Sequence, residues 1–287
     1  MLFRSIQGTA AVALAGIFSA LRVTRGKLRE QTLLFLGAGE AATGIADLVA
    51  SAMVAQGCSE AGARRRNWLM DSRGLVVKAR SDLAEHKLPY AHDHAPIGDF
   101  LTAIRTLKPS AIIGVAATGG MFTREVLETM AELNGRPIVF ALSNPTSKSE
   151  CTAEEAYRHT DGRALFACGS PFEPVNLNGR TFVPRQGNNS YIFPGVGLGA
   201  IASGARRITN EMFMGAACTL ANLVSEADLK QGSLYPALNR IREVSAHIAA
   251  EVAQVAYTGG FADGQAPHDM LVHVKSQMYD ACYSSSV

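Results

Sequence analysis

Short apolar runs alternate with helix-like segments through the first two thirds of the chain. The runs lie at residues 32–36, 68–70, 111–115, 137–142 and 164–167, with glycine, proline or polar residues between them and their neighbours. Uninterrupted apolar runs of this length are typical of parallel strands that are buried on both faces. Strands that alternate with helices predict an α/β fold, a Rossmann-like doubly wound parallel sheet covered by helices on both sides.

Several local signals place the helices and turns between these strands. Thr123 is a suitable cap for a helix that runs to Leu133. Thr152 and Glu155 have the spacing of a capping box, which predicts the start of another helix. Asn178-Gly179, between two apolar positions, predicts a hairpin turn.

The pattern changes after the last predicted strand. Residues 196–224 and 238–257 have helical spacing and contain no strand-like run, and the tail from Gly259 is turn-rich except for a short stretch around 270–278. We therefore expect a dinucleotide-binding domain over 1–205 and a helical C-terminal extension, 206–287, that packs on it.

The segment 9–21 near the start of the chain is an apolar helix by pattern. Arg4, Arg22 and Arg25 flank it and no acidic residue precedes Glu30, so it superficially resembles a targeting peptide. Glycine and serine interrupt the apolar run, which is also too short for a membrane span. We interpret it as a buried helix packed on the nucleotide-binding domain, and we expect no membrane partner.

The composition is that of a globular protein with a substantial core. Of 287 residues, 47% are hydrophobic and 18% are charged, and the net charge of +2 gives no reason to expect a nucleic-acid partner. The five cysteines are odd in number and form no CxxC pattern, so neither a disulfide framework nor a zinc site is indicated. A reducing compartment is expected, the cytoplasm or alternatively the mitochondrion.

The first predicted strand leads directly into a glycine-rich turn, Gly37-Ala38-Gly39-Glu40-Ala41-Ala42. Gly37 permits a tight turn, and Gly39 lets a diphosphate approach the backbone. Ala42 is small enough for close packing of helix on strand, and the N-terminus of the following helix attracts phosphate. Glu40 would repel phosphate unless its side chain points away.

Asp71 ends the second predicted strand, where an acid can bind the ribose hydroxyls of a dinucleotide. It lies further from the glycine turn than the usual ~20 residues, and we assign the extra length to a charged loop at 58–67. Ser72, Arg73 and Lys87 could bind the additional 2′-phosphate of NADP. From these residues alone, the choice between NAD and NADP stays open.

Five motifs, in order along most of the chain, resemble those of the malic enzymes. They are Ile6-Gln-Gly-Thr-Ala10, Gly37-Ala-Gly-Glu-Ala-Ala42, Trp68-Leu-Met-Asp-Ser-Arg-Gly-Leu75, Phe140-Ala-Leu-Ser-Asn-Pro-Thr-Ser147 and Gln186-Gly-Asn-Asn-Ser-Tyr-Ile-Phe-Pro-Gly195. Leu234-Tyr-Pro-Ala-Leu-Asn-Arg-Ile-Arg242 extends the resemblance into the helical region. The resemblance implies oxidative decarboxylation of malate to pyruvate and carbon dioxide with NAD(P) and a divalent metal.

The resemblance also implies roles for individual residues. NADP-using members have similar residues to Asp71, Ser72, Arg73 and Lys87, which makes NADP the expected cofactor and NAD the weaker alternative. Cofactor contacts are further expected at Thr9, Ala116, Ala117, Asn144 and Asn188. Substrate contacts, to malate or pyruvate, are expected at Asn144, Asn188 and Asn189. The full-length form is expected to be a homo-oligomer.

The family's catalytic tyrosine and lysine, and two of its metal-binding carboxylates, lie in a preceding domain. Where the family has two aspartates before its Ile-Gln-Gly-Thr motif, this sequence has Arg4 and Ser5. We therefore expect neither catalytic residues nor a Mg or Mn site in this chain, which would be inactive alone, whether as a truncation or as a natural short form. A nucleotide-binding pseudoenzyme or regulatory module is the alternative, and an enzyme that uses S-adenosylmethionine is less favoured.

Replacement of Lys87 tests the cofactor assignment. Lys87→Gln should weaken the binding of NADP far more than that of NAD, because it removes the cation expected at the 2′-phosphate. Titrations of both nucleotides into wild type and variant measure the effect. An NADP affinity that is the same before and after the change would refute the assignment.

Overall fold

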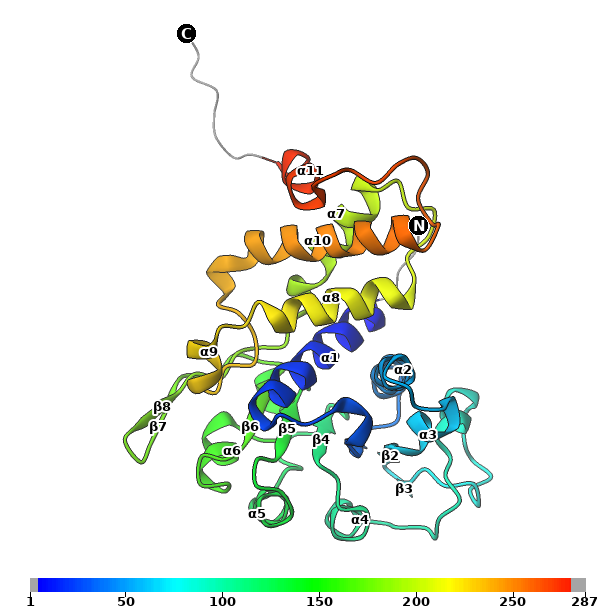
Figure 1. The fold of residues 1–287 in the computed structure, drawn as a ribbon. Helices are drawn as coiled ribbons and strands as arrows, with labels where there is room; N and C mark the ends of the chain where they lie inside the picture. Colours follow the sequence, from blue (N-terminus) through cyan, green and yellow to red (C-terminus); the bar gives the residue numbers. More distant parts are fainter. Residues whose placement is uncertain (1–4, 280–287) are drawn as a thin grey trace.

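A six-stranded sheet in the order β3-β2-β1-β4-β5-β6 forms the centre of the computed structural model, which describes residues 5–279 (Figure 1). All neighbouring strands are parallel except β2 and β3. The strand order reverses between β1 and β4, which creates the crevice where open α/β sheets bind ligands. The strands are β1 (Leu33–Leu36), β2 (Asn67–Asp71), β3 (Gly74–Leu75), β4 (Ala111–Gly114), β5 (Ile138–Ala141) and β6 (Leu165–Cys168).

Helices cover both faces of the sheet, which confirms the predicted Rossmann-like α/β class. Within β1, Leu33 and Phe35 face one hydrophobic core, and Leu34 and Leu36 face the other. The first core includes side chains from α1 (Ser5–Thr24), α2 (Glu40–Ala55), α8 (Asn210–Asn222) and α10 (Ile241–Thr258). The second includes side chains from α4 (Phe100–Leu107), α5 (Arg124–Leu133) and α6 (Ala153–Arg158).

The helical C-terminal part lies against the first core, on the far side of α1 from the sheet (Figure 1). In it, α10 packs against α7 (Phe193–Ala202), α8 and α11 (Met270–Ser276). The helix expected over 196–224 is interrupted, because Gly204 takes a left-handed conformation (φ +65°) after α7. The proposed boundary near residue 205 stays a prediction. A short helix, α9 (Glu226–Lys230), lies between α8 and α10 along the chain.

Local capping signals were reliable, whereas two short helices escaped the pattern. Thr123 caps α5, the Thr152–Glu155 capping box is formed, and the predicted hairpin appears as β7 (Val175–Leu177) and β8 (Arg180–Phe182). The charged stretch expected to be a loop instead contains α3 (Glu60–Arg65), whose first turn the Ser59 side chain caps. Helix α4 was not predicted, although Asp99 caps it.

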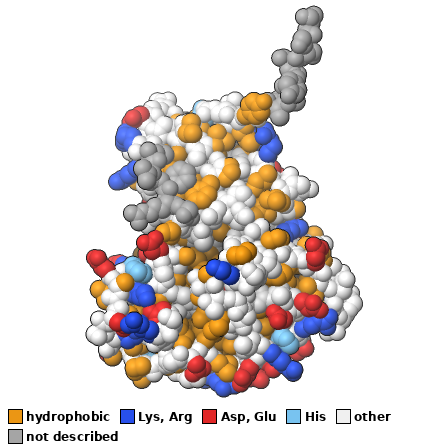
Figure 2. All heavy atoms as spheres, turned by 180° about the vertical axis from the view of Figure 1, so that it is seen from behind, with side chains coloured by type: hydrophobic (Ala, Val, Ile, Leu, Met, Phe, Trp, Pro, Cys, Tyr) orange, Lys and Arg blue, Asp and Glu red, His pale blue; other side chains and the backbone are white. Residues whose placement is uncertain are grey.

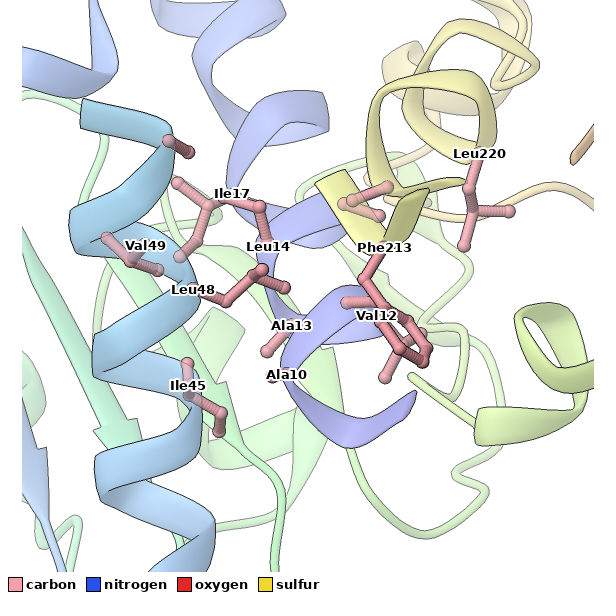
Figure 3. Close-up of a cluster of buried hydrophobic side chains, with 14 of the residues drawn as sticks. Ala10, Val12, Ala13, Leu14, Ile17, Ile45, Leu48, Val49, Phe213 and Leu220 are labelled. Atoms are coloured by element: carbon pink, nitrogen blue, oxygen red, sulfur yellow. The ribbon is translucent and has the colours of Figure 1, made fainter. Parts of the chain in front are cut away.

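The apolar helix α1 lies between α2 and α8, as Figure 3 shows. Leu14 and Ile17 point toward the side chains of α2, and Val12 lies beside Phe213 of α8. By length and composition the segment Ile6–Thr24 could cross a membrane, but about two thirds of it (67%) is buried inside the fold. The prediction of a buried helix packed on the nucleotide-binding domain is confirmed.

Figure 2 shows the opposite face of the molecule. Charged side chains lie mainly along its edges, and hydrophobic side chains form small groups among uncharged polar surface. Scattered exposed hydrophobic residues such as Ile201 and Val272 are ordinary for a globular protein.

Truncation of Leu14 tests the importance of α1 to the core. Leu14 is fully buried, so Leu14→Ala should lower the free energy of unfolding by about 2–5 kcal/mol through lost burial and an unfilled cavity. Urea unfolding measures this loss. Val54→Ala is the control, since Val54 lies on α2 but is 41% exposed, and it should cost less than about 1 kcal/mol. Equal losses in the two variants would show that α1 is not a core element.

Candidate nucleotide-binding site

The glycine turn brings the end of β1 against the end of β4. Gly37 has φ +123°, and a side chain there would place its Cβ 3.0 Å from the carbonyl carbon and oxygen of Val115. Gly39 is the N-cap of α2 and has open space where a Cβ would be. Ala42 is buried against the first core. The turn therefore leaves an unobstructed path to the first N–H groups of α2.

A cleft of about 600 Å³ lies above the reversal point of the sheet. Its lining includes six residues that the sequence predicts to contact the cofactor: Gly37, Ala38, Gly39, Asp71, Ser72 and Ala116. Further lining residues that the sequence did not indicate include Asp99, Thr118 and Met121. The position agrees with the general rule that ligands of open α/β sheets bind beyond the carboxyl ends of the strands.

Glu40 is exposed and lines a separate cavity beside α1 and α8, together with Gln7 and Asn210. It is not among the residues that line the cleft. The Glu40 side chain therefore lies outside the cleft in which the phosphates are expected. Ala41 follows it in the first turn of α2 and is half-buried.

Asp71 is the centre of a compact group of ion pairs at the end of β2. Both of its oxygens accept from the Arg80 guanidinium, at 2.8 and 3.1 Å, and Oδ2 also accepts from Lys87 Nζ at 2.6 Å. Asp82 accepts from Arg80 at 2.7 Å and from Arg73 at 2.9 Å. We call these five residues the Asp71 cluster. Its three cations share two carboxylates, so one positive charge is left over.

The members of the Asp71 cluster differ in exposure and therefore in freedom to meet a ligand. The side chains of Arg80, Asp71 and Lys87 are 11%, 14% and 18% exposed, whereas that of Arg73 is 72% exposed. Burial alone would raise the pKa of Asp71, but the hydrogen bonds from Arg80 and Lys87 outweigh it and lower the pKa to about 2. The carboxylate is thus ionised throughout the physiological range.

Lys87 lies on a 3₁₀ helix, η2 (Glu85–Tyr90), that is attached to the glycine turn and to α2. His86 Nε2 lies 3.2 Å from the carbonyl oxygen of Ala38. The Tyr90 hydroxyl donates to Asp47 of α2 at 2.7 Å, and burial raises the pKa of this tyrosine. These contacts fix the position of Lys87 relative to the cleft.

Asn144 lies in the loop after β5, and its carboxamide oxygen accepts from the Ser170 hydroxyl at 2.9 Å. Ala117, beyond the end of β4, has φ +53° and donates its N–H to the Ser143 hydroxyl oxygen at 2.9 Å. The structure therefore brings the loops that carry Ala116, Ala117 and Asn144 together, at the edge of the sheet where the cleft lies.

Thr9, Asn188 and Asn189 form a second group of predicted residues. The Thr9 hydroxyl donates to the carboxamide oxygen of Asn189 at 3.2 Å, across 180 positions of the chain. Asn188 caps the 3₁₀ helix η4 (Asn189–Tyr191) by accepting from the N–H of Ser190. These three residues are not among those that line the cleft. Their expected contacts with cofactor and substrate stay predictions.

Within residues 5–279, no group of three or more His, Cys, Asp or Glu side chains could hold a metal ion. The sequence-based expectation for Arg4 concerns a residue outside this range, and that for Ser5 concerns a side chain outside the described set. The described residues therefore do not fit the divalent metal of the family.

The reversed sheet order, the glycine turn and the basic group around Asp71 together define a dinucleotide-binding domain of the Rossmann kind. The chain belongs to the malic enzyme family, because the family model described as "Malic enzyme, NAD binding domain" matches residues 6–257. The suspected family, which is one of oxidoreductases, is thereby confirmed.

Relatives and solved structures agree with this membership. NADP-dependent malic enzymes of Anas platyrhynchos and Rattus norvegicus are 50% and 52% identical over 98% and 97% of this chain. The chain spans about half the length of these relatives (51% and 49%). A Pyrococcus horikoshii malic enzyme structure has a TM-score of 0.69 at 29% identity, covering 94% of this chain and 58% of its own. The Entamoeba histolytica malic enzyme, at 24% identity and a TM-score of 0.76 over 94% of this chain and 52% of its own, supports the fold.

Three residues that matter to the site were absent from the sequence-based set. Arg80 and Asp82 belong to the Asp71 cluster, and Glu150 is a fully buried acid beside the loops after β4 and β5. Arg80 could have been found, since it is a cation nine positions after Asp71 in a segment already suspected of binding phosphate. Glu150 had no signal, because an acid between Ser149 and Cys151 looks like loop polarity.

The Asp71 cluster predicts a specific loss of stability in acid. The pKa of Asp71 is lowered from 3.8 to about 2, so its contribution is complete above about pH 4 and is lost as the pH falls toward 2. The free energy of unfolding of the wild type should exceed that of Asp71→Asn by roughly 2 kcal/mol near neutral pH, and this difference should shrink in acid. Urea unfolding at several pH values measures it, with Asp93→Asn as the exposed control. A difference that stays constant with pH would disprove this account.

Proposed function

We propose that this chain binds NADP in the cleft above β1 and β4, as the nucleotide-binding part of an NADP-dependent malic enzyme. The observation that carries the proposal is the excess positive charge of the Asp71 cluster beside a glycine turn. A 2′-phosphate is doubly charged near neutral pH and pairs best with cations and hydroxyls. NAD has no such group and would leave the extra positive charge of the cluster uncompensated.

The residues of the cleft fit the parts of NADP. The diphosphate lies against Gly39 and the N-terminus of α2, where there is open space and N–H groups are available. The 2′-phosphate meets Lys87, Ser72 and the exposed Arg73 guanidinium. Asp71, which already accepts from Arg80 and Lys87, orients these cations rather than presenting free oxygens to ribose hydroxyls.

The nicotinamide lies toward the ends of β4 and β5, near Ala116, Ala117 and Asn144. When bound, NADP supplies a ring that accepts hydride from the substrate. Asn144, Asn188 and Asn189 bind malate or pyruvate, since a carboxamide can donate to a carboxylate and accept from a hydroxyl. These side chains bind and orient; proton transfer and metal binding are functions of residues outside the described set.

The wider proposals concern the whole enzyme. Relatives named NADP-dependent malic enzymes support oxidative decarboxylation of malate to pyruvate and carbon dioxide as its reaction. We place it in the cytoplasm, with the mitochondrion as the alternative, as a homo-oligomer that uses Mg or Mn. Within this chain, we propose residues 1–205 as the nucleotide-binding unit and 206–287 as the helical extension.

A nucleotide titration tests the central proposal. The full chain should bind NADPH at least about tenfold more tightly than NADH, because a charge-assisted contact to the 2′-phosphate contributes roughly 1.5–3 kcal/mol. The enhancement of nucleotide fluorescence measures both affinities. Added salt should reduce the preference, since it screens exposed ion pairs such as that of Arg73. Equal affinities, or no binding of either nucleotide, would disprove the proposal.

A further inference from the structure

Glu150 is a fully buried carboxylic acid for which the proposed binding mode gives no role. It follows the loop after β5, and its side chain fills the space that a side chain at Gly114 would take. A Cβ on Gly114, the last residue of β4, would lie 2.3 Å from the carboxyl carbon of Glu150. The acid therefore sits directly against the end of β4, at the level where the cleft begins.

Donors surround this carboxyl. The Ser143 hydroxyl donates to Oε1 at 2.5 Å, and the Ser143 N–H donates to Oε2 at 3.4 Å. The nearby N–H of Ala116 also acts to lower the pKa of this carboxyl. The Ser143 hydroxyl oxygen in turn accepts from the N–H of Ala117 at 2.9 Å. Glu150 thus connects the backbone beyond β4 with the backbone beyond β5.

The two loops are joined at further points by their backbones. Gly120 donates to the carbonyl of Ser149 at 3.0 Å, and Phe122 donates to that of Glu150 at 2.9 Å. Ala117 has a left-handed conformation, which is unfavourable for a residue with a side chain. Its hydrogen bond to Ser143 stabilises that conformation, so the shape of this loop depends on the Ser143–Glu150 pair.

Burying a carboxylate to this degree costs folding free energy unless the group is hydrogen-bonded or paired with a charge. Burial raises the pKa of Glu150, and the donors of Ser143 and the backbone act in the opposite direction. An apolar residue would fill the same space without the cost of desolvation. What an apolar residue could not do is accept from the hydroxyl and the N–H of Ser143, and so fix the serine that in turn accepts from Ala117.

We propose that Glu150 is a positioning residue for the nicotinamide half of bound NADP. By holding the loops after β4 and β5 together, it sets where Ala116, Ala117 and Asn144 meet the ring. The adenine half and the 2′-phosphate lie at the Asp71 cluster, on the other side of the glycine turn, and do not depend on it. This inference rests on the proposed function, since it takes the cleft to be an NADP site.

The two halves of the ligand can be tested separately on the full chain. Adenosine 2′,5′-bisphosphate carries the adenine half with its 2′-phosphate and lacks nicotinamide. Glu150→Gln should weaken the binding of NADPH by about tenfold, because the NH₂ group of the glutamine amide donates where a carboxylate oxygen accepts. It should change the affinity for adenosine 2′,5′-bisphosphate by less than about twofold. The fluorescence enhancement of bound NADPH, which reports burial of the nicotinamide, should fall as well.

Two further variants complete the design. Ser143→Ala removes the hydroxyl that joins Ala117 to Glu150 and should reproduce the selective loss of NADPH affinity. Ser245→Ala removes a buried serine hydroxyl of α10 that bonds to Ile241, and it should leave both ligands unaffected. If Glu150→Gln does not fold, Ser143→Ala decides the question in the same way.

The outcomes separate this inference from the proposed function. Selective loss of NADPH affinity supports the positioning role. An equal loss of affinity for both ligands would show that Glu150 has a purely structural role. Unchanged affinity for both would show that the two loops do not depend on Glu150. Either result overturns the inference while the proposed function stands. If the wild-type chain binds neither ligand, the proposed function is overturned, and the inference with it.

Discussion

Close contact between backbones at the reversal point of the sheet is the constraint on which the site depends. Gly37 lies against the carbonyl of Val115, and Gly114 leaves room for the carboxyl of Glu150. Two missing side chains, at the ends of β1 and β4, thus create both the path to the N-terminus of α2 and the space for a buried acid. A side chain at Gly114 would meet the Glu150 carboxyl directly, and one at Gly37 would press on the carbonyl group of Val115.

The polar groups around the cleft hold one another in place. Arg80 and Lys87 hold Asp71, Arg73 pairs with Asp82, and Glu150 holds two loops through Ser143. Groups that are already fixed lose less entropy when they meet a ligand. In the proposed binding mode the two groups have separate tasks. The Asp71 cluster supplies the excess charge that would distinguish NADP from NAD, and Glu150 would set the shape of the loops after β4 and β5.

Predictions from the sequence agreed best with the structure where a feature depends on a few neighbouring residues. The glycine turn, the capping box at Thr152 and the hairpin at Asn178 each follow from a few adjacent positions, and all are present. Lys87 and Asp71 were both singled out, but as separate contacts rather than as an ion pair. Helix α4 was missed because it spans only eight residues and its cap, Asp99, follows an irregular segment.

By itself, the sequence determined the class of fold, the glycine turn and the family, because each depends on local pattern or on motifs in a fixed order. Only the tertiary structure decided that Arg80 shares Asp71 with Lys87, that Glu150 fills the space beside Gly114, and that α1 lies between α2 and α8. The physical reason is distance along the chain. The partners of these contacts are separated in sequence by loops, whole helices or most of the protein. Only the assembly of the sheet and the packing of its two cores bring them together.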